Sequence, residues 1–391
     1  MKGKRYSSDS PEHDESKKIK TIRRIETRDG EIRNLPEEII IEILARVPVK
    51  SLLKFRCVSK SWHSLISSSQ FIKTHLKNAT NKSNFSNHRV MVTICNPHFD
   101  LKHCSLRSLM FEPVTVASNI DYPQKNPHKA VWIVGSCNGL ICIAIDEKDI
   151  YLWNPTTRVS RKIPPAAVKM KQGFYYLWGF GYNEPDDDYN IVGIFCVFGS
   201  GGVYESIVKI YSLRANSWKR IEDFKGGIPL DDSGKFASGK IHFSATPGID
   251  LDSRWKIVSL DMKNEVYGIV EQPNYGEGYF DSFLGVLGGC ICVLCNYQKT
   301  RADVWVMKEY GVKESWSKVV TIPYVNDPGR FLYSKPLCML PNGDISLVFG
   351  NHFIVYNVKD NSFRHPETSN VAAFLEADIY VESLVSPEME V

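Results

Sequence analysis

Cysteine, histidine and aspartate are the side chains of this 391-residue chain whose spacing could support metal or thiol chemistry. Cys290, Cys292 and Cys295 lie in one alternating run typical of a strand, so the first two point to one face and the third to the other. Without a bulge, that geometry cannot present a Cys-x-x-Cys pair to one ion, and no second Cys-x-x-Cys completes a zinc site. The ten cysteines also lack the secretory context of a disulfide framework, so we interpret them as packing residues.

Other groups could hold a metal, a phosphate or a catalytic site. A loose ligand-like group, interpreted as core and loop residues, consists of Cys95, His98, His103 and Cys104. The acidic run 186–188 falls where a turn between strands is expected, and the glycine-rich run 199–202 leads into a strand rather than a helix N-terminus that could bind phosphate. The histidines are scattered, so the sequence predicts no catalytic residue, metal or cofactor; an enzyme remains the alternative.

The elements that must position these residues repeat about every fifty residues. A turn glycine opens an alternating strand at Gly139, Gly239, Gly289 and Gly343, and Asp188 opens the strand that fills the gap. A second strand follows about fifteen to twenty residues later and ends in a polar turn and an aromatic residue. Four strand-like runs per unit predict an all-β, kelch-like β-propeller of about six blades over residues 85–386. A β-sandwich or two β-domains are the alternative.

The first blade is predicted from strand-like runs at 89–94 and 105–111. A further strand at 374–384 follows the last unit without a blade of its own. We expect it to complete the first blade and close the ring, since closure removes the exposed sheet edges of an open array.

Composition narrows the class of protein further. The first residues carry no apolar run for a signal peptide and no later stretch is long enough for a membrane span, so we expect a cytoplasmic or nuclear protein. The net charge of +4 implies no nucleic-acid partner. Residues 1–33 form a polar, disordered tail; within it, 17–24 is basic and is interpreted either as a nuclear import signal or as a solvated arm.

Between residues 34 and 80 the pattern becomes helical. The first predicted helix has Asn34 as its cap, Pro36 in its first turn and Pro48 at its end. Its apolar stripe consists of Ile39, Ile40, Ile43, Leu44 and Val47. A second stripe consists of Leu52, Phe55, Val58 and Trp62, and a third helix continues from Trp62 to Leu76.

Three short helices cannot bury so many large apolar side chains alone, because small domains have little interior. A partner is therefore implied, and Ile41, which falls off the stripe, is predicted to be exposed to it. The alternative is that the helices pack on the propeller or on one another.

The run 35–66 resembles an F-box, with Val47 in place of the leucine usual in that family. The rest of the chain resembles the F-box-associated interaction domain of plant F-box proteins, including the F-box/kelch-repeat proteins. The phrases that carry this second resemblance are 135–140, 152–156, 179–182 with 187–189, 211–213 with 216–218, 285–292 and 303–310.

The resemblance implies a non-catalytic substrate receptor of an SCF ubiquitin ligase. The F-box would bind a Skp-family adaptor and, through it, a cullin, while the propeller would hold a target protein for ubiquitination and degradation. Some family members act in plant defence and others in self-incompatibility, many are uncharacterised, and this chain is more similar to the general and defence-associated group. The adaptor-binding positions that the resemblance implies are Leu35, Pro36, Ile39, Ile43, Leu44, Pro48, Leu52, Val58 and Trp62. An interaction scaffold outside any ligase is a further alternative.

Target binding is expected at irregular loops on one rim of the propeller, because such loops carry function on rigid scaffolds. The candidate loops are 166–177, 199–206, 224–236 and 274–281. Aromatic side chains often anchor interfaces, and those in or near these loops are Tyr175, Tyr176, Trp178, Tyr204, Tyr275 and Tyr279. Blade packing is the alternative role for each of them.

Overall fold

The computed structural model describes most of the chain. The described residues are 25–26, 32–33, 35–81, 85–168, 175–198, 204–230, 233–247, 255–276, 280–324, 331–371 and 373–388. The chain divides into two compact units, Met1–His75 and Leu76–Val391. Within the N-terminal tail, β1 (Ile25–Glu26) and β2 (Ile32–Arg33) pair antiparallel. Asn34 and the basic run 17–24 lie outside the described residues.

The first unit is built from helices, as the periodicity predicts. They are α2 (Glu37–Leu44), α3 (Val49–Phe55), α4 (Lys60–Ser67) and α5 (Ser69–Thr80), the last of which crosses the division between the units. The two prolines differ from their predicted positions. Pro36 is the N-cap of α2 rather than a first-turn residue, and α2 ends at Leu44, so that Pro48 is the N-cap of α3 and does not end the preceding helix.

The predicted third helix is divided in two at Ser68. This residue is extended (φ −70°, ψ 141°), and its hydroxyl donates to the Leu65 carbonyl at 2.8 Å and accepts the Phe71 N–H at 3.3 Å. A serine side chain that satisfies backbone groups in this way competes with a continuous helix. One hydroxyl therefore ends α4 and begins α5.

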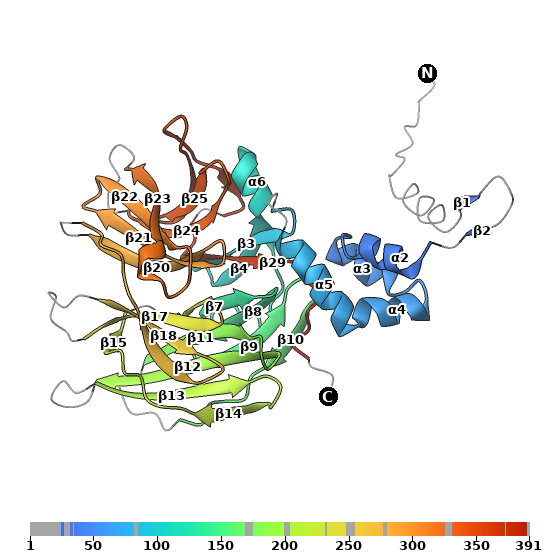
Figure 1. Cartoon of the computed structure of the whole chain (residues 1–391), viewed down its shortest axis with the longest axis horizontal. Helices are drawn as coiled ribbons and strands as arrows, with labels where there is room; N and C mark the ends of the chain where they lie inside the picture. Colours follow the sequence, from blue (N-terminus) through green and yellow to red (C-terminus); the bar gives the residue numbers. More distant parts are fainter. Residues whose placement is uncertain are drawn as a thin grey trace, which may run out of the picture. The chain divides into compact units, whose positions relative to one another are not determined.

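The second unit is a six-bladed propeller, as predicted (Figure 1). Blade 1 contains β3 (His88–Ile94), β4 (Asp100–Ser105), β6 (Ser118–Asn119) and β29 (Glu376–Val381). Blade 2 contains β7 (Val131–Cys137), β8 (Leu140–Ile145), β9 (Asp149–Asn154) and β10 (Val159–Lys162). Blade 3 contains β11 (Tyr175–Asn183), β12 (Asp188–Phe198), β13 (Tyr204–Ser212) and β14 (Ser217–Arg220).

The remaining blades follow the same antiparallel order. Blade 4 contains β15 (Ile228–Pro229), β16 (Lys235–Ala237), β17 (Lys240–Thr246), β18 (Lys256–Asp261) and β19 (Val266–Val270). Blade 5 contains β20 (Asp281–Leu287), β21 (Cys290–Tyr297), β22 (Arg301–Met307) and β23 (Trp316–Pro323), with the 3-10 helix η2 (Lys313–Ser315) before β23. Blade 6 contains β24 (Tyr333–Met339), β25 (Ile345–Phe349), β26 (His352–Asn357) and β27 (Ser362–Arg364). Outside the blades, β5 (Val114–Val116) pairs parallel with β28 (Glu367–Ser369).

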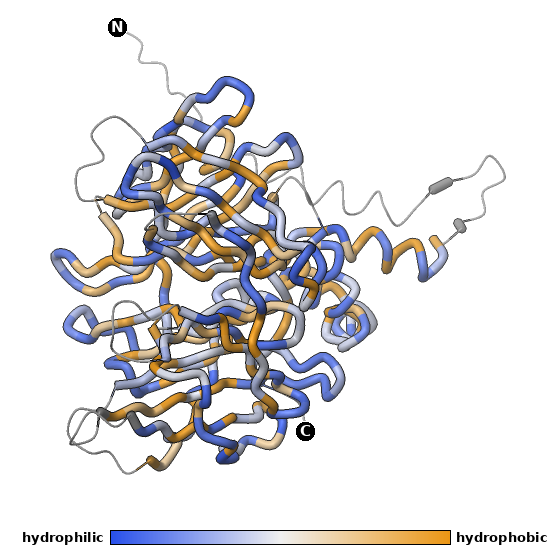
Figure 2. Tube along the Cα trace, turned by 60° about the vertical axis from the view of Figure 1, so that its left-hand side comes forward, coloured by the Kyte–Doolittle hydropathy of each residue, from blue (hydrophilic) through white to orange (hydrophobic). Residues whose placement is uncertain are grey.

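The turns explain why the repeated phrases recur. Gly139, Gly239, Gly289 and Gly343 have φ of +85°, +73°, +83° and +94°, which glycine adopts without a steric cost. In blades 2, 4 and 6, asparagine or aspartate at the end of the third strand makes the next turn: the side-chain oxygen of Asp261, for example, accepts the N–H groups two and three residues later, each at 3.0 Å. Figure 2 shows apolar residues along the strands and polar residues at the turns.

The aromatic residues on the outer strands connect neighbouring blades. The indole N–H of Trp218 donates to the Pro164 carbonyl at 2.7 Å, and the indole N–H of Trp316 donates to the Glu271 carbonyl at 2.8 Å. Both carbonyls belong to the loop that enters the blade from the preceding one. Each aromatic residue thus packs its ring and satisfies its one polar group at a blade junction.

The ring closes as predicted, because β29 pairs antiparallel with β3. On β29, Glu376 Oε1 accepts the N–H of Ile133 at 2.8 Å and so joins the closing strand to blade 2. Beyond β29, the amide of Asn154 donates to the carbonyls of Ser383 and Val385 at 3.0 and 2.7 Å. The segment after the last strand is therefore fixed to blade 2.

The run 105–111, predicted as a strand of the first blade, forms helix α6 (Leu106–Phe111) instead. The Ser105 hydroxyl accepts the Ser108 N–H at 3.2 Å and caps the helix. Leu106, Leu109 and Met110 are buried at helical spacing, which is why an apolar run of this length is ambiguous from sequence.

Most of the cysteines are buried packing residues in this fold, whereas Cys57 and Cys95 are exposed. Cys292 lies in one core cluster with Cys290 packed against it, whereas Cys295 lies in another, as alternation predicted. Burial raises the pKa of the Cys292 thiol to about 12, so it is neutral. Cys104 is buried while Cys95 is exposed, so the loose ligand-like group does not converge. Among the described residues, no three His, Cys, Asp or Glu side chains are arranged to hold a metal ion, and no helix could span a membrane.

Candidate functional site

One surface of interest is a face of α2. Ile39 and Ile43, one helical turn apart, are 41% and 43% exposed, while Leu44 and Ala45 on the opposite face are buried. Ile41, predicted to be exposed, is instead half-buried. The prediction is therefore wrong for Ile41, whereas Ile39 and Ile43, which belong to the predicted stripe and to the predicted adaptor-binding residues, are the exposed ones. Exposed branched side chains at this spacing form an apolar stripe that a partner can cover.

The predicted adaptor-binding residues fall into three groups by exposure. The exposed ones are Pro36, Ile39, Ile43, Pro48 and Val58. Leu35 and Trp62 are half-buried, and Leu44 and Leu52 are buried, so the last two belong to the core rather than the surface. Direct contact of the surface residues with an adaptor stays a prediction.

The end of α3 and the start of α4 position the second half of this surface. The Ser59 hydroxyl caps α4 by accepting the Trp62 N–H at 3.1 Å. The Trp62 ring then packs edge-on against Phe55 with 5.6 Å between ring centroids, next to the exposed Val58. Near Ile43, Glu42 forms an exposed ion pair with Arg46, which contributes little to stability.

The predicted target-binding loops lie at one rim of the propeller. In an antiparallel blade, the loop from an outermost strand to the next innermost strand lies at the same end as the turn between the second and third strands. Loops 166–177, 224–236 and 274–281 are of the first kind and 199–206 is of the second. Tyr204 side-chain atoms and all of Tyr279 lie outside the described residues.

The aromatic residues predicted in blade 3 are packed to different degrees. Trp178 is buried, donates its indole N–H to the Glu147 carbonyl at 2.8 Å and contacts the Phe195 ring, so it serves the blade 2 to blade 3 junction. Tyr176 stacks on Trp178 with 6.2 Å between centroids and is half-buried, as is Tyr175. Only the two tyrosines leave part of their surface available.

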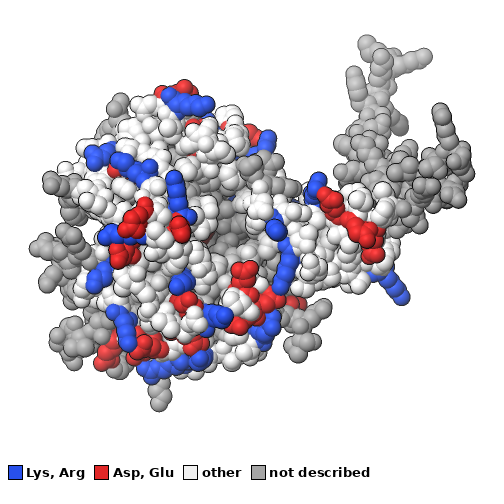
Figure 3. Space-filling model, viewed as in Figure 1, with Lys and Arg blue, Asp and Glu red and all other residues white. Residues whose placement is uncertain are grey.

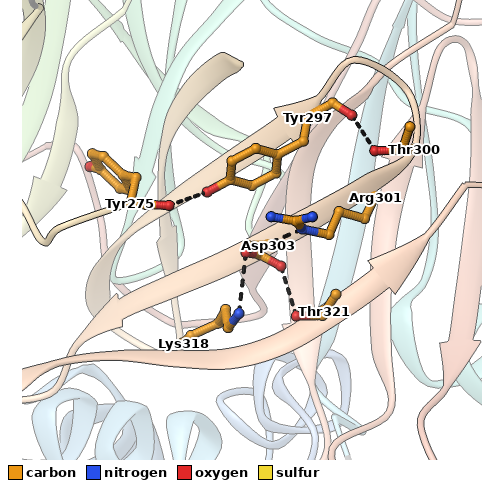
Figure 4. Close-up of polar contacts among 7 residues, drawn as sticks. All are labelled: Tyr275, Tyr297, Thr300, Arg301, Asp303, Lys318 and Thr321. Atoms are coloured by element: carbon orange, nitrogen blue, oxygen red, sulfur yellow. Dashed lines mark hydrogen bonds and ion pairs between the residues drawn. The ribbon is translucent and has the colours of Figure 1, made fainter. Parts of the chain in front are cut away.

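Tyr275 belongs to a cluster that sequence reasoning found only in part. Its half-buried ring packs edge-on against Phe280 at 5.2 Å and Trp305 at 6.0 Å, and its carbonyl accepts the Tyr297 hydroxyl at 2.8 Å (Figure 4). Burial raises the pKa of Tyr297 to about 12. Arg301, which lies over the Tyr297 ring, was missed; an arginine four residues after a tyrosine across a short turn was the available signal.

The innermost strands enclose a central cavity of about 880 Å³. Its charged lining includes Lys335 and Asp378, which form an ion pair at 3.3 Å, and Lys235. Of the predicted target-binding residues, those whose side chains the structure describes do not line it. Figure 3 shows acidic and basic side chains interspersed over the visible face rather than a field of one sign.

Both ring nitrogens of the buried His242 are hydrogen-bonded. His242 donates from Nδ1 to the Lys235 carbonyl at 3.0 Å, and its Nε2 accepts from the Tyr310 hydroxyl at 2.8 Å. Burial lowers the pKa of His242 to about 4, so the ring is neutral. Both nitrogens are used by neighbours, and this histidine is a structural residue.

Comparison with known families agrees with both units. The profile of the F-box domain matches residues 32–74, and that of the F-box associated beta propeller domain matches residues 60–387. The chain belongs to the family of F-box proteins that carry an F-box associated β-propeller. An F-box implies binding to a Skp-type adaptor.

Two relatives from Arabidopsis thaliana illustrate the similarity. The F-box/kelch-repeat protein At3g23880 is 33% identical over 361 residues, which cover 90% of this chain and 96% of that protein. The F-box protein CPR1 is 31% identical over 329 residues, which cover 78% of this chain and 76% of that protein. The similarity extends over both units.

Proposed function

We propose that this chain is the substrate-recognition subunit of an SCF-type ubiquitin ligase. Its F-box binds a Skp-family adaptor, the adaptor connects it to a cullin, and its propeller binds the protein to be ubiquitinated and degraded. The observation that carries the proposal is the α2 face, where Ile39 and Ile43 are exposed one turn apart on a short helix that buries Leu44. An isolated helical unit gains nothing from these two side chains, whereas an adaptor that covers them removes apolar surface from water.

The mechanism requires proximity rather than a reacting group. A receptor that holds both the adaptor and the target raises the effective concentration of target lysines near the ubiquitin-loaded enzyme. The full occupancy of His242 by Lys235 and Tyr310 supports a non-catalytic propeller.

Two further parts of the proposal, the cellular location and the pathway, are supported by fewer observations. A site of action in the cytoplasm or nucleus follows from the ligase role, because ubiquitin conjugation occurs there. A role in plant defence rests on the resemblance to the defence-associated members of the family.

The test is adaptor binding by the purified full chain. Ile39→Asp with Ile43→Asp places two charges on the α2 face, and we expect the affinity for a recombinant plant Skp-type adaptor to fall at least a hundredfold, about 2.7 kcal/mol. Isothermal titration calorimetry measures the dissociation constants of the native chain and the variant.

A matched control changes exposed apolar residues elsewhere. Val266 and Ile269 on β19 are also largely exposed, so Val266→Asp with Ile269→Asp makes the same chemical change on the propeller. The control should bind the adaptor like the native chain. Equal affinities for the native chain and the α2 variant would refute the proposed function.

A further inference from the structure

Arg301, the first residue of β22, is held over an aromatic platform. Its guanidinium carbon lies 4.3 Å from the centroid of the Tyr297 ring. Tyr297 is itself buried, and its hydroxyl is fixed by the Tyr275 carbonyl (Figure 4). A guanidinium stacked on an immobile ring loses less rotamer freedom on binding than a solvated arginine does.

A buried carboxylate lies beneath this guanidinium. Asp303 is 3% exposed in its side chain, and its Oδ1 accepts the Thr321 hydroxyl at 2.7 Å. Its Oδ2 lies 3.4 Å from Lys318 Nζ and 3.9 Å from Arg301 Nε, so Asp303 orients the inner edge of the guanidinium. One carboxylate therefore faces two cations.

The two cations outnumber the single carboxylate, and the excess positive charge is exposed to solvent. The side chains of Arg301 and Lys318 are 51% and 45% exposed, while the only acid that pairs with them in the described part of the chain is buried. Within the same part, no hydrogen bond joins the two outer nitrogens of Arg301 to the protein. These nitrogens form the fork that binds a carboxylate through two parallel hydrogen bonds.

The surroundings are those of an interface anchor. The turn that precedes Arg301 joins the second and third strands of blade 5, so it lies at the rim that carries the 274–281 loop. Tyr275, Phe280 and Trp305 pack together beside Tyr297. Tyrosine, tryptophan and arginine are the residues most enriched among those that dominate binding energy.

We propose that Arg301 is the anchor for a carboxylate side chain of the target, so that the propeller recognises an acidic segment of a protein at the blade 5 rim. The Tyr297 ring and Asp303 hold the guanidinium in place, and the neighbouring aromatic cluster accepts apolar parts of the same segment. This inference rests on the proposed function, since it describes the target side of the same receptor.

The test uses peptides as probes, with the full chain bound to a Skp-type adaptor. A fluorescein-labelled peptide of alternating Glu and Tyr is compared with its Gln counterpart by fluorescence anisotropy at 150 mM salt. We expect the Glu peptide to bind at least tenfold more tightly, and Arg301→Gln to remove this preference. Arg301→Lys should retain only part of it, because lysine keeps the charge but not the fork.

The control is Arg107→Gln, which removes an exposed arginine that also lies over a ring, that of Phe111 at 5.8 Å, but in another blade. It should keep the Glu preference, and melting curves should show every variant folded. A Glu preference that survives in folded Arg301→Gln would overturn the proposal. Binding of a phosphoserine peptide but not of the Glu peptide would also overturn it, since the source of the anion would be wrong.

The peptide and adaptor measurements fail independently. If Arg301→Gln leaves the preference for the Glu peptide unchanged while adaptor binding is intact, only the acidic-segment proposal is refuted. Insensitivity of adaptor binding to the α2 substitutions refutes the ligase proposal whatever the peptides do.

Discussion

The α2 face of the helical unit and the blade junctions of the propeller differ in how far their large apolar side chains are covered. In the helical unit, α2 leaves Ile39 and Ile43 exposed although it is only eight residues long. In the propeller, Trp316 is buried at a blade junction and its one polar atom is hydrogen-bonded. The α2 face is thus exposed, whereas the blade junctions are part of a ring that β29 closes.

This difference separates two kinds of recognition. A partner common to many receptors can recognise a regular helix face, because the helix backbone fixes the spacing of the side chains on that face. A partner specific to one receptor is better read by side chains on turns, such as Arg301, since turns vary without disturbing the blades. Substitutions that affect one unit and spare the other can break or sharpen this comparison.

The largest effect is expected at the junction of blade 2 with the end of the chain. In Gly139→Val, the new Cβ would lie 2.3 Å from Ser383 Oγ and 2.6 Å from the Val381 carbonyl, at a φ of +85°. We expect the propeller to lose about 4 kcal/mol of stability or more, measured by urea unfolding of the full chain.

Gly239→Val is its matched control. Its φ is +73°, but a Cβ there meets nothing within 4 Å, so only the backbone cost of about 1 to 2 kcal/mol should remain. Hydrogen exchange of α3 and α4 should stay native in both variants. Similar losses at the two glycines would contradict the fixed position of residues 381–383.

A smaller loss is expected in the core of the helical unit. Leu52 is 0% exposed, and Leu52→Ala should cost about 3 kcal/mol through lost burial and a cavity. Faster hydrogen exchange in α3 and α4 would report it. Ile39→Ala, at an exposed position, should leave exchange unchanged and weaken adaptor binding instead. If Leu52→Ala changed only adaptor affinity, its assignment to the core would be wrong.

The propeller should also lose stability in mild acid through His242. Its pKa is about 4 when folded and near 6.5 when unfolded, so below pH 6.5 the unfolded chain binds a proton that the folded chain does not. Stability is therefore fully present above pH 6.5 and falls by roughly 3 kcal/mol as the pH approaches 4. Burial lowers the pKa of His88 as well, which adds to the slope.

His242→Gln tests this assignment. The amide keeps hydrogen-bonding groups without titrating in this range, so the dependence of the melting temperature on pH between 6.5 and 4.5 should become shallower. His63→Gln, on the exposed surface of α4, should leave that dependence unchanged. If the melting temperature of His242→Gln depends on pH as steeply as that of the native chain, His242 does not cause the loss of stability in acid.

The smallest of these effects is expected at a blade junction. Trp316→Phe keeps most of the ring but removes the N–H that donates to Glu271, and should cost about 1 kcal/mol. Differential scanning calorimetry would detect the shift. Trp132→Phe, at a largely exposed position, should shift the melting temperature less. Equal shifts would mean that the hydrogen bond to Glu271 is not what stabilises the junction.

The sequence allowed the propeller to be predicted better than the surfaces it carries. Gly139 and Asp261 mark turns because their backbone conformation or side-chain hydrogen bonds restrict the residue type, and such restrictions repeat with each blade. Residues 105–111 were misassigned because a short apolar run fits a buried strand as well as a buried helix, and the Ser105 cap decided between them.

The candidate sites were less predictable for two reasons. The exposure of Ile41 was predicted wrongly because this residue falls off the apolar stripe, whereas on this short helix Ile41 is half-buried and the stripe residues Ile39 and Ile43 are exposed. Arg301 carried no strong signal, since its stacking on Tyr297 depends on a turn in which Gln298 and Lys299 adopt φ of +46° and +58°. Glycine or asparagine is the residue expected at such positive φ angles, so the sequence does not indicate this turn.

Ring closure by β29 has a consequence for how the chain is made. Strand β3 begins at His88, but its partner on the inner side, Glu376–Val381, is synthesised after the strands of all the other blades. During synthesis the helices of the first unit emerge long before the ring can close, and the free edge of β3 stays open for most of translation. A premature stop before residue 376 therefore yields a polypeptide that still carries the α2 face but lacks the closing strand. Under the proposed function, such a product would occupy adaptors without delivering targets.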